Sequence, residues 1–195
     1  MDAAISTLKV VHILTAVLMA WPFYALVAVN QRARLGPPVG DRLDTFLENT
    51  IKNRAVPCFV FQATALLSGL LLVVLRGFSV SYLVSNPTLA AKLALLVLIA
   101  GSLSYVMFAI QPQLDSLFAR LASSAAPPDV AGKIAVLRLR RKRMASACLF
   151  GVLSAAMLGL QVWAPFPGYL TFLFILAIAA FVWRAYSSVI PYGWV

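Results

Sequence analysis

The side chains best suited to chemistry in this chain are four nitrogen-bearing groups near the ends of long apolar stretches. His12 is the only histidine, and Lys9 stands three residues before it, on the same face of a helix. Arg76 follows the second apolar stretch, and Lys92 opens the third. Neutral imidazole is a common metal ligand, and cations without nearby carboxylates attract anions. The pattern predicts a cofactor site of Lys9, His12, Arg76 and Lys92, with His12 as the metal ligand.

The same four residues also have an ordinary explanation. Lys and Arg at the ends of membrane spans commonly extend to lipid headgroups, and a histidine can simply hydrogen-bond a neighbouring helix. As a site, the group would suit haem propionates, a lipid phosphate or the polarised carbonyl of a quinone. A single histidine can supply one axial ligand of a haem iron, so the second position would be open or filled by another group.

Several other kinds of chemistry have no candidate residues. The sequence holds no Ser-His-Asp arrangement, phosphate-binding loop or metalloprotease motif, so no catalytic residue is predicted. Cys58 and Cys148 stand alone, without a CxxC or CxxCH motif, which excludes a zinc knuckle and a covalently attached c-type haem. The methionines are scattered and do not fall in the register that a copper path requires.

The elements that must position these groups are apolar stretches long enough to cross a membrane. The 195 residues are 62% hydrophobic and 11% charged, whereas a soluble domain is roughly 25% charged. About 20 apolar residues cross ~30 Å of hydrocarbon as a helix, the form that satisfies its own backbone in lipid. We therefore predict an all-α fold: one polytopic transmembrane domain over residues 1–195, with five transmembrane helices at about 5–29, 56–75, 89–110, 145–163 and 169–189.

The distribution of charge predicts an orientation. The first and third connections are rich in Lys and Arg, whereas the second and fourth carry none, so the basic connections should be cytoplasmic. The N-terminus is then outside and the C-terminus is cytoplasmic. This rule also explains the net charge of +10 without nucleic acid as a partner. All six acidic residues are expected at the N-terminus or in loops, which argues against ion-coupled transporters and proton pumps.

The third connection, residues 111–143, is predicted to be a basic cytoplasmic loop that contains an amphipathic helix. Its apolar residues Leu114, Leu117, Phe118 and Leu121 have helical spacing. A break is expected at Pro127-Pro128, followed by a helix that continues into the fourth span. The basic run beside this span predicts an anchor for anionic lipids rather than a nucleic-acid patch. Its members are Arg138, Arg140, Arg141, Lys142 and Arg143.

Three short motifs resemble a group of small bacterial membrane proteins. They are Lys9-Val10-Val11-His12 in the first helix, Ser68-Gly69 in the second and Lys92-Leu93 in the third. The group includes the copper-resistance-protein-D-like domain, related membrane proteins of unknown function, and the membrane-bound haem-containing protoporphyrinogen oxidase. The resemblance covers about residues 5–163. It implies the bacterial inner membrane, and it implies that His12 and Lys92 would be the residues tied to haem b and activity.

Three functions remain open at this point. The sequence differs from the oxidase branch because it lacks further histidines and adds a fifth helix. This favours an accessory or structural subunit of a membrane assembly related to electron transfer, with other membrane subunits as partners. The alternatives are a haem-binding membrane oxidoreductase similar to protoporphyrinogen oxidase, and a copper-handling membrane protein implied by the copper-resistance resemblance alone.

Overall fold

The computed structural model describes residues 2–34, 39–52, 55–121 and 129–188, and these residues form helices and their connections, with no strand among them. Five helices are long and apolar enough to cross a membrane, as the hydropathy of the sequence predicts. Their apolar parts belong to the following elements: α1 (Asp2–Asn30), α3 (Ala55–Leu75), α5 (Pro87–Tyr105) with the π-helical turn η2 (Val106–Ile110), α7 (Val130–Trp163) and α8 (Gly168–Ser187).

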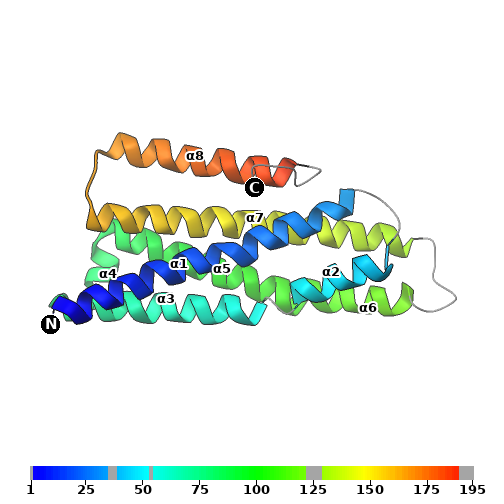
Figure 1. The fold of residues 1–195 in the computed structure, drawn as a ribbon, viewed down its shortest axis with the longest axis horizontal. Helices are drawn as coiled ribbons and strands as arrows, with labels where there is room; N and C mark the ends of the chain where they lie inside the picture. Colours follow the sequence, from blue (N-terminus) through cyan, green and yellow to red (C-terminus); the bar gives the residue numbers. More distant parts are fainter. Residues whose placement is uncertain (1, 35–38, 53–54, 122–128, 189–195) are drawn as a thin grey trace.

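The long helix α7 is the centre of the bundle. It packs against α1 and α5, α8 lies along its other side, and α3 packs mainly on α1 (Figure 1). One core joins these five helices through buried side chains such as Phe23, Cys58, Ile99, Leu149 and Val182. Gly151 lets α5 approach α7 closely, since an added Cβ there would lie 3.2 Å from two atoms of the Ile99 side chain. Small residues at such crossings are typical of membrane helix packing.

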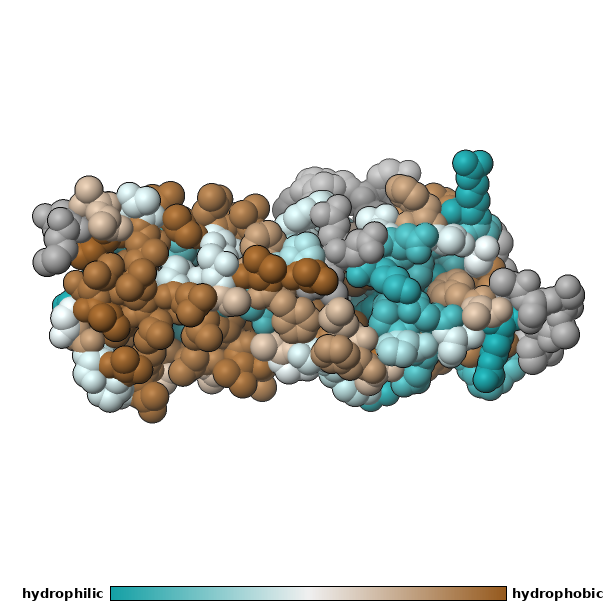
Figure 2. Space-filling view, turned by 90° about the horizontal axis from the view of Figure 1, so that it is seen from below, coloured by the Kyte–Doolittle hydropathy of each residue, from teal (hydrophilic) through white to brown (hydrophobic). Residues whose placement is uncertain are grey.

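The two ends of the bundle differ in character. One end holds the beginning of α1, the end of α7 and the short helix α4 (Tyr82–Ser85), which precedes α5. The other end extends beyond α8 and holds α2 (Arg42–Lys52), α6 (Gln111–Leu121), the short helix η1 (Gln31–Arg34) and the first turns of α7 (Figure 1). Figure 2 shows the apolar surface gathered toward the first end and the hydrophilic surface toward the second. We call them the apolar end and the polar end.

Helix α6 lies in the third connection, where the sequence predicts an amphipathic helix. Leu114 and Leu117 of α6 are buried in a second small core, where they meet Ile134 of α7. The expected break at Pro127-Pro128 lies outside the described residues, and α7 runs without interruption from Val130 into the fourth span.

Three of the acidic residues lie on helices within the connections where they were expected. Asp44 and Glu48 lie on α2, and Asp115 lies on α6. Helix α2 forms because its first turn carries Asp44 and its last turn carries Lys52, which both suit the helix dipole. Its acidic side chains Asp44 and Glu48 lie on one face and are buried rather than solvated. This face pairs with basic side chains of other elements at the polar end.

Candidate cofactor site

His12 of α1 is held by a serine of the neighbouring helix. Its Nδ1 atom lies 2.8 Å from Ser68 Oγ, on α3. The Ser68 hydroxyl also lies 2.6 Å from the backbone oxygen of Thr64, to which it donates its one proton. Ser68 can then only accept from His12, so the proton of a neutral imidazole is assigned to Nδ1. The lone pair is left on Nε2, the atom that would bind a metal.

The packing around the imidazole depends on a glycine one residue beyond Ser68. A Cβ added to Gly69 would lie 3.1 Å from His12 Cε1, which is closer than ordinary van der Waals contact. The sequence pair Ser68-Gly69 therefore does two things at once: the serine fixes the ring, and the glycine makes room for it. Residues that orient a ligating histidine in this way are a common feature of metal sites.

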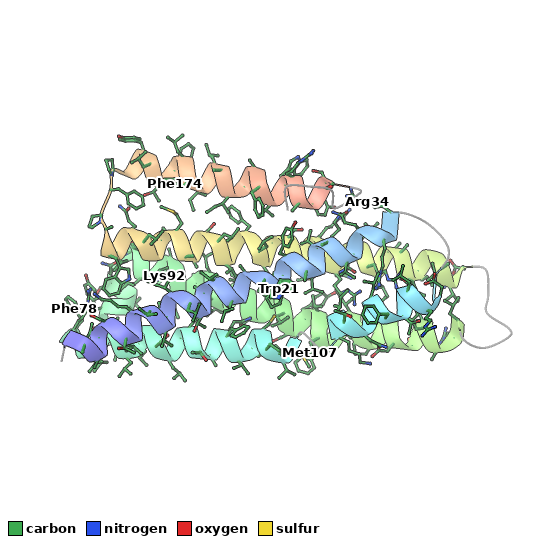
Figure 3. All side chains as sticks on the ribbon, in the orientation of Figure 1. Trp21, Arg34, Phe78, Lys92, Met107 and Phe174 are labelled. Carbon is green, nitrogen blue, oxygen red and sulfur yellow. The ribbon has the colours of Figure 1, made fainter. Side chains whose placement is uncertain are left out.

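Lys92 lies in the same part of the bundle. It is near enough to His12 for the charge of its ammonium group to act on the imidazole. Its ammonium group points at α7, where a Cβ added to Gly159 would lie 3.1 Å from Lys92 Nζ. Figure 3 shows Lys92 at the apolar end of the bundle, near the last turns of α7. The structure thus brings together His12 and Lys92, two of the four residues that the sequence singled out.

Lys9 and Arg76 both contact the ring of a tryptophan at the end of α7. Lys9 Nζ lies 4.1 Å from the centroid of the Trp163 ring, and Arg76 Cζ lies 4.0 Å from it. Such cation–π contacts contribute about 0.5–1 kcal/mol each at exposed sites. The four predicted residues therefore form two pairs, both at the apolar end, and the contacts of Lys9 and Arg76 with Trp163 were not predicted from the sequence.

The electrostatics of this end are unbalanced. Among the described side chains, none of Lys9, His12, Arg76 and Lys92 forms an ion pair with a carboxylate. The acidic residues of α2 and α6 lie at the polar end (Figure 1). A half-buried imidazole with a free nitrogen beside an uncompensated ammonium group can bind a metal-containing anion.

A second cluster, at the polar end, was not predicted from the sequence. Arg141 of α7 is completely buried and donates to Glu48 of α2 at 2.5 Å and to Asn30 of α1 at 2.9 Å. Arg138 donates to Asp44 at 2.8 Å, and Arg32 donates to Glu48 as well. We call Asn30, Arg32, Asp44, Glu48, Arg138 and Arg141 the buried ion network.

The buried ion network changes the interpretation of the basic run in α7. Arg138, Arg141 and Lys142 are buried, whereas Arg140 and Arg143 are exposed. Three of the five side chains therefore face other helices. Arg140 and Arg143 stay as the candidates in this run for the expected contact with anionic lipids. The signal was present in the sequence, because Asp44 and Glu48 are spaced four residues apart and so share one face of a helix.

Comparisons with known proteins identify no relative. No family model, no curated protein and no solved structure matches this chain. The resemblance to the copper-resistance and protoporphyrinogen oxidase group therefore remains an expectation from its three short motifs.

Proposed function

We propose that this chain is a multi-pass protein of the bacterial inner membrane that binds a haem-type cofactor at the apolar end of its bundle. His12 would be an axial ligand through Nε2, and Lys92 would contact a propionate. The observation that carries the proposal is the hydrogen bond between His12 and Ser68, which assigns the free lone pair to Nε2. A proximal histidine is a standard way to hold haem iron.

The residues present fit such a group in part. They supply one nitrogen ligand, fixed by Ser68, and one ammonium group without a carboxylate partner among the described side chains. Lys9 and Arg76 are close by on Trp163 and could turn from the ring to further acidic groups. When bound, haem would supply one-electron chemistry, and the role of the protein would be to hold and orient it. No catalytic residue is assigned.

The test is an optical spectrum of the chain extracted in mild detergent from its native membrane. We expect a haem Soret band that is absent from both His12→Ala and His12→Gln. Glutamine can still hydrogen-bond Ser68, so its variant separates loss of an iron ligand from loss of packing. Colourless wild-type protein that also fails to take up added haem, or a Soret band kept in His12→Gln, would refute the proposal.

A subunit role in an electron-transfer assembly is the second candidate, and the placement of α8 favours it. This helix packs on α7 and, to a smaller extent, on α1, and it leaves large apolar side chains exposed, such as Phe172, Leu173 and Leu176. Partner helices could cover this face, as lipid could. Co-purification with other membrane proteins in fixed stoichiometry, unchanged in His12→Ala, would support a subunit without a cofactor.

Copper handling has less support. No group of three or more His, Cys, Asp or Glu side chains gathers among the residues that the structure describes. Growth at high and at limiting copper, with and without the protein, tests this alternative, and equal growth at both extremes would remove it.

A further inference from the structure

Three basic side chains gather around one tyrosine where α8 ends. Arg34 of η1 has its Cζ 5.2 Å from the centroid of the Tyr186 ring, and Lys142 of α7 has its Nζ 4.8 Å from it. Arg143 donates from Nε to the Tyr186 hydroxyl at 3.3 Å. Two separate elements, η1 and α7, thus bring three cations to one side chain of α8. We call Arg34, Lys142, Arg143 and Tyr186 the tyrosine cluster.

The partners of these cations are neutral. Arg34 also donates to the backbone oxygen of Ser187 at 3.1 Å. Lys142 donates to the side-chain oxygen of Gln31 and, at 2.5 Å, to the backbone oxygen of Tyr186. Within the described residues, no carboxylate forms an ion pair with any of the three. Neutral oxygens and a ring face satisfy hydrogen bonds but do not neutralise a charge.

Lys142 differs from its neighbour Arg141, which belongs to the buried ion network and is paired with a carboxylate. Arg141 and Lys142 are adjacent in sequence and both are completely buried. Arg141 turns to Glu48, whereas Lys142 turns the other way, to α8. A buried ammonium group is costly unless it is paired with an opposite charge. Lys142 donates to two neutral oxygens and has no carboxylate partner among the described side chains.

The cluster lies where the apolar parts of its helices stop. Arg34 follows the apolar part of α1, Arg143 precedes that of α7, and Tyr186 stands in the last turn of α8. Figure 3 shows Arg34 next to the end of α8. Trp183, beside Tyr186 at 6.3 Å between ring centroids, is exposed. Trp and Tyr are enriched at the level of lipid headgroups, so the cluster lies at the membrane surface.

We propose that the tyrosine cluster is a binding site for a phosphate group at the membrane surface, carried by an anionic phospholipid or free in solution. Arg34 and Arg143 are exposed and would contact the phosphate oxygens directly. Arginine suits phosphate because its guanidinium group can donate two parallel hydrogen bonds. Buried Lys142 would contribute its charge from behind, and Tyr186 would hold the two arginines in place.

The experiment measures binding by the full chain after removal of lipid in detergent, from the rise of its unfolding temperature with added ligand. The three probes are short-chain phosphatidylglycerol, short-chain phosphatidylcholine and inorganic phosphate. We expect phosphatidylglycerol to bind and phosphatidylcholine not to bind. If inorganic phosphate binds as tightly as phosphatidylglycerol, the ligand is soluble phosphate, and if it binds more weakly, the ligand is the lipid.

A matched pair of double variants separates a built site from general surface charge. Arg34→Gln with Arg143→Gln removes two charges from the cluster. Arg42→Gln with Arg184→Gln removes two exposed arginines near the same end that are not members of the tyrosine cluster. The first should weaken binding about thirtyfold, at ~1 kcal/mol for each basic residue, and the second less than about threefold.

Equal losses in the two double variants would overturn the proposal, because diffuse attraction would then explain the binding. So would wild-type protein that binds neither phosphatidylglycerol nor inorganic phosphate. Tyr186→Phe gives an independent check, since it keeps the ring and removes only the hydroxyl that accepts from Arg143. Its binding should fall between those of wild type and the Arg34/Arg143 variant.

Discussion

His12 Nδ1 lies 2.8 Å from Ser68 Oγ, and the serine in turn donates to the backbone of its own helix. This polar contact joins α1 to α3. The contact fixes which nitrogen of the imidazole is free, so a serine with no possible role as an iron ligand still controls the proposed site. The first two predictions concern this contact and the glycine beside it.

Ser68→Ala should weaken haem binding about 10- to 100-fold, the usual cost of losing a partner that orients a metal ligand. The measurement is a titration of the apoprotein with haem, followed by absorbance. Thr64→Val is the matched control, because the Thr64 hydroxyl is also on α3 but donates only to the backbone of Val60. Equal affinities for Ser68→Ala and wild type would show that the serine does not orient the ligand.

Gly69→Ala should disturb His12 more than any other glycine substitution in the spans. The new Cβ would lie 3.1 Å from the imidazole, so the ring must move or α1 and α3 must separate. Gly101→Ala serves as control, since nothing lies within 4 Å of an added Cβ there. We expect the unfolding temperature to drop, and the haem affinity to weaken, in the Gly69 variant and not in the Gly101 variant. Gly159→Ala should be milder, because the Lys92 ammonium group is a flexible end that can shift.

Glu48→Gln should be among the most destabilising single substitutions at the polar end. Glu48 accepts from Arg32 and Arg141 and contacts Arg138, so its loss leaves three largely buried guanidinium groups with one carboxylate, Asp44. Breaking a buried pair in this way costs about 3–5 kcal/mol. Chemical unfolding in detergent measures the change.

Asp115→Asn provides the comparison for Glu48. Asp115 pairs with Lys52 at 2.8 Å, but both side chains are about half exposed. Exposed pairs contribute roughly 0–1 kcal/mol, so this variant should unfold almost as wild type does. Similar losses in Glu48→Gln and Asp115→Asn would contradict a structural role for the buried ion network.

Orientation can be tested by labelling single cysteines in whole cells. Ser81→Cys, in the connection before α4, should react with a membrane-impermeant maleimide added outside. Ser116→Cys, on the exposed side of α6, should react only after the membrane is opened. Cys58 and Cys148 are buried, so the natural cysteines should give little background. The reverse pattern would place the basic end outside, against the charge rule.

The number of transmembrane helices follows from the sequence alone, because an apolar stretch of about 20 residues with few charges has few alternatives to a membrane helix. The amphipathic helix at Gln111–Leu121 was also predictable from its spacing. Hydropathy and periodicity are properties of neighbouring residues, so they need no knowledge of which helices meet. Lys9, His12, Arg76 and Lys92 could be named as candidates for the same reason.

The tertiary structure decided which polar groups face one another. Ser68 acts on His12 across 56 positions of sequence, and Glu48 acts on Arg141 across 93. Spacing within one helix gives no information about such pairs, which depend on how α1, α3 and α7 are rotated against each other. The basic run of α7 shows the consequence: adjacent residues of one charge face different helices, because each helical residue is rotated by about 100° from the last.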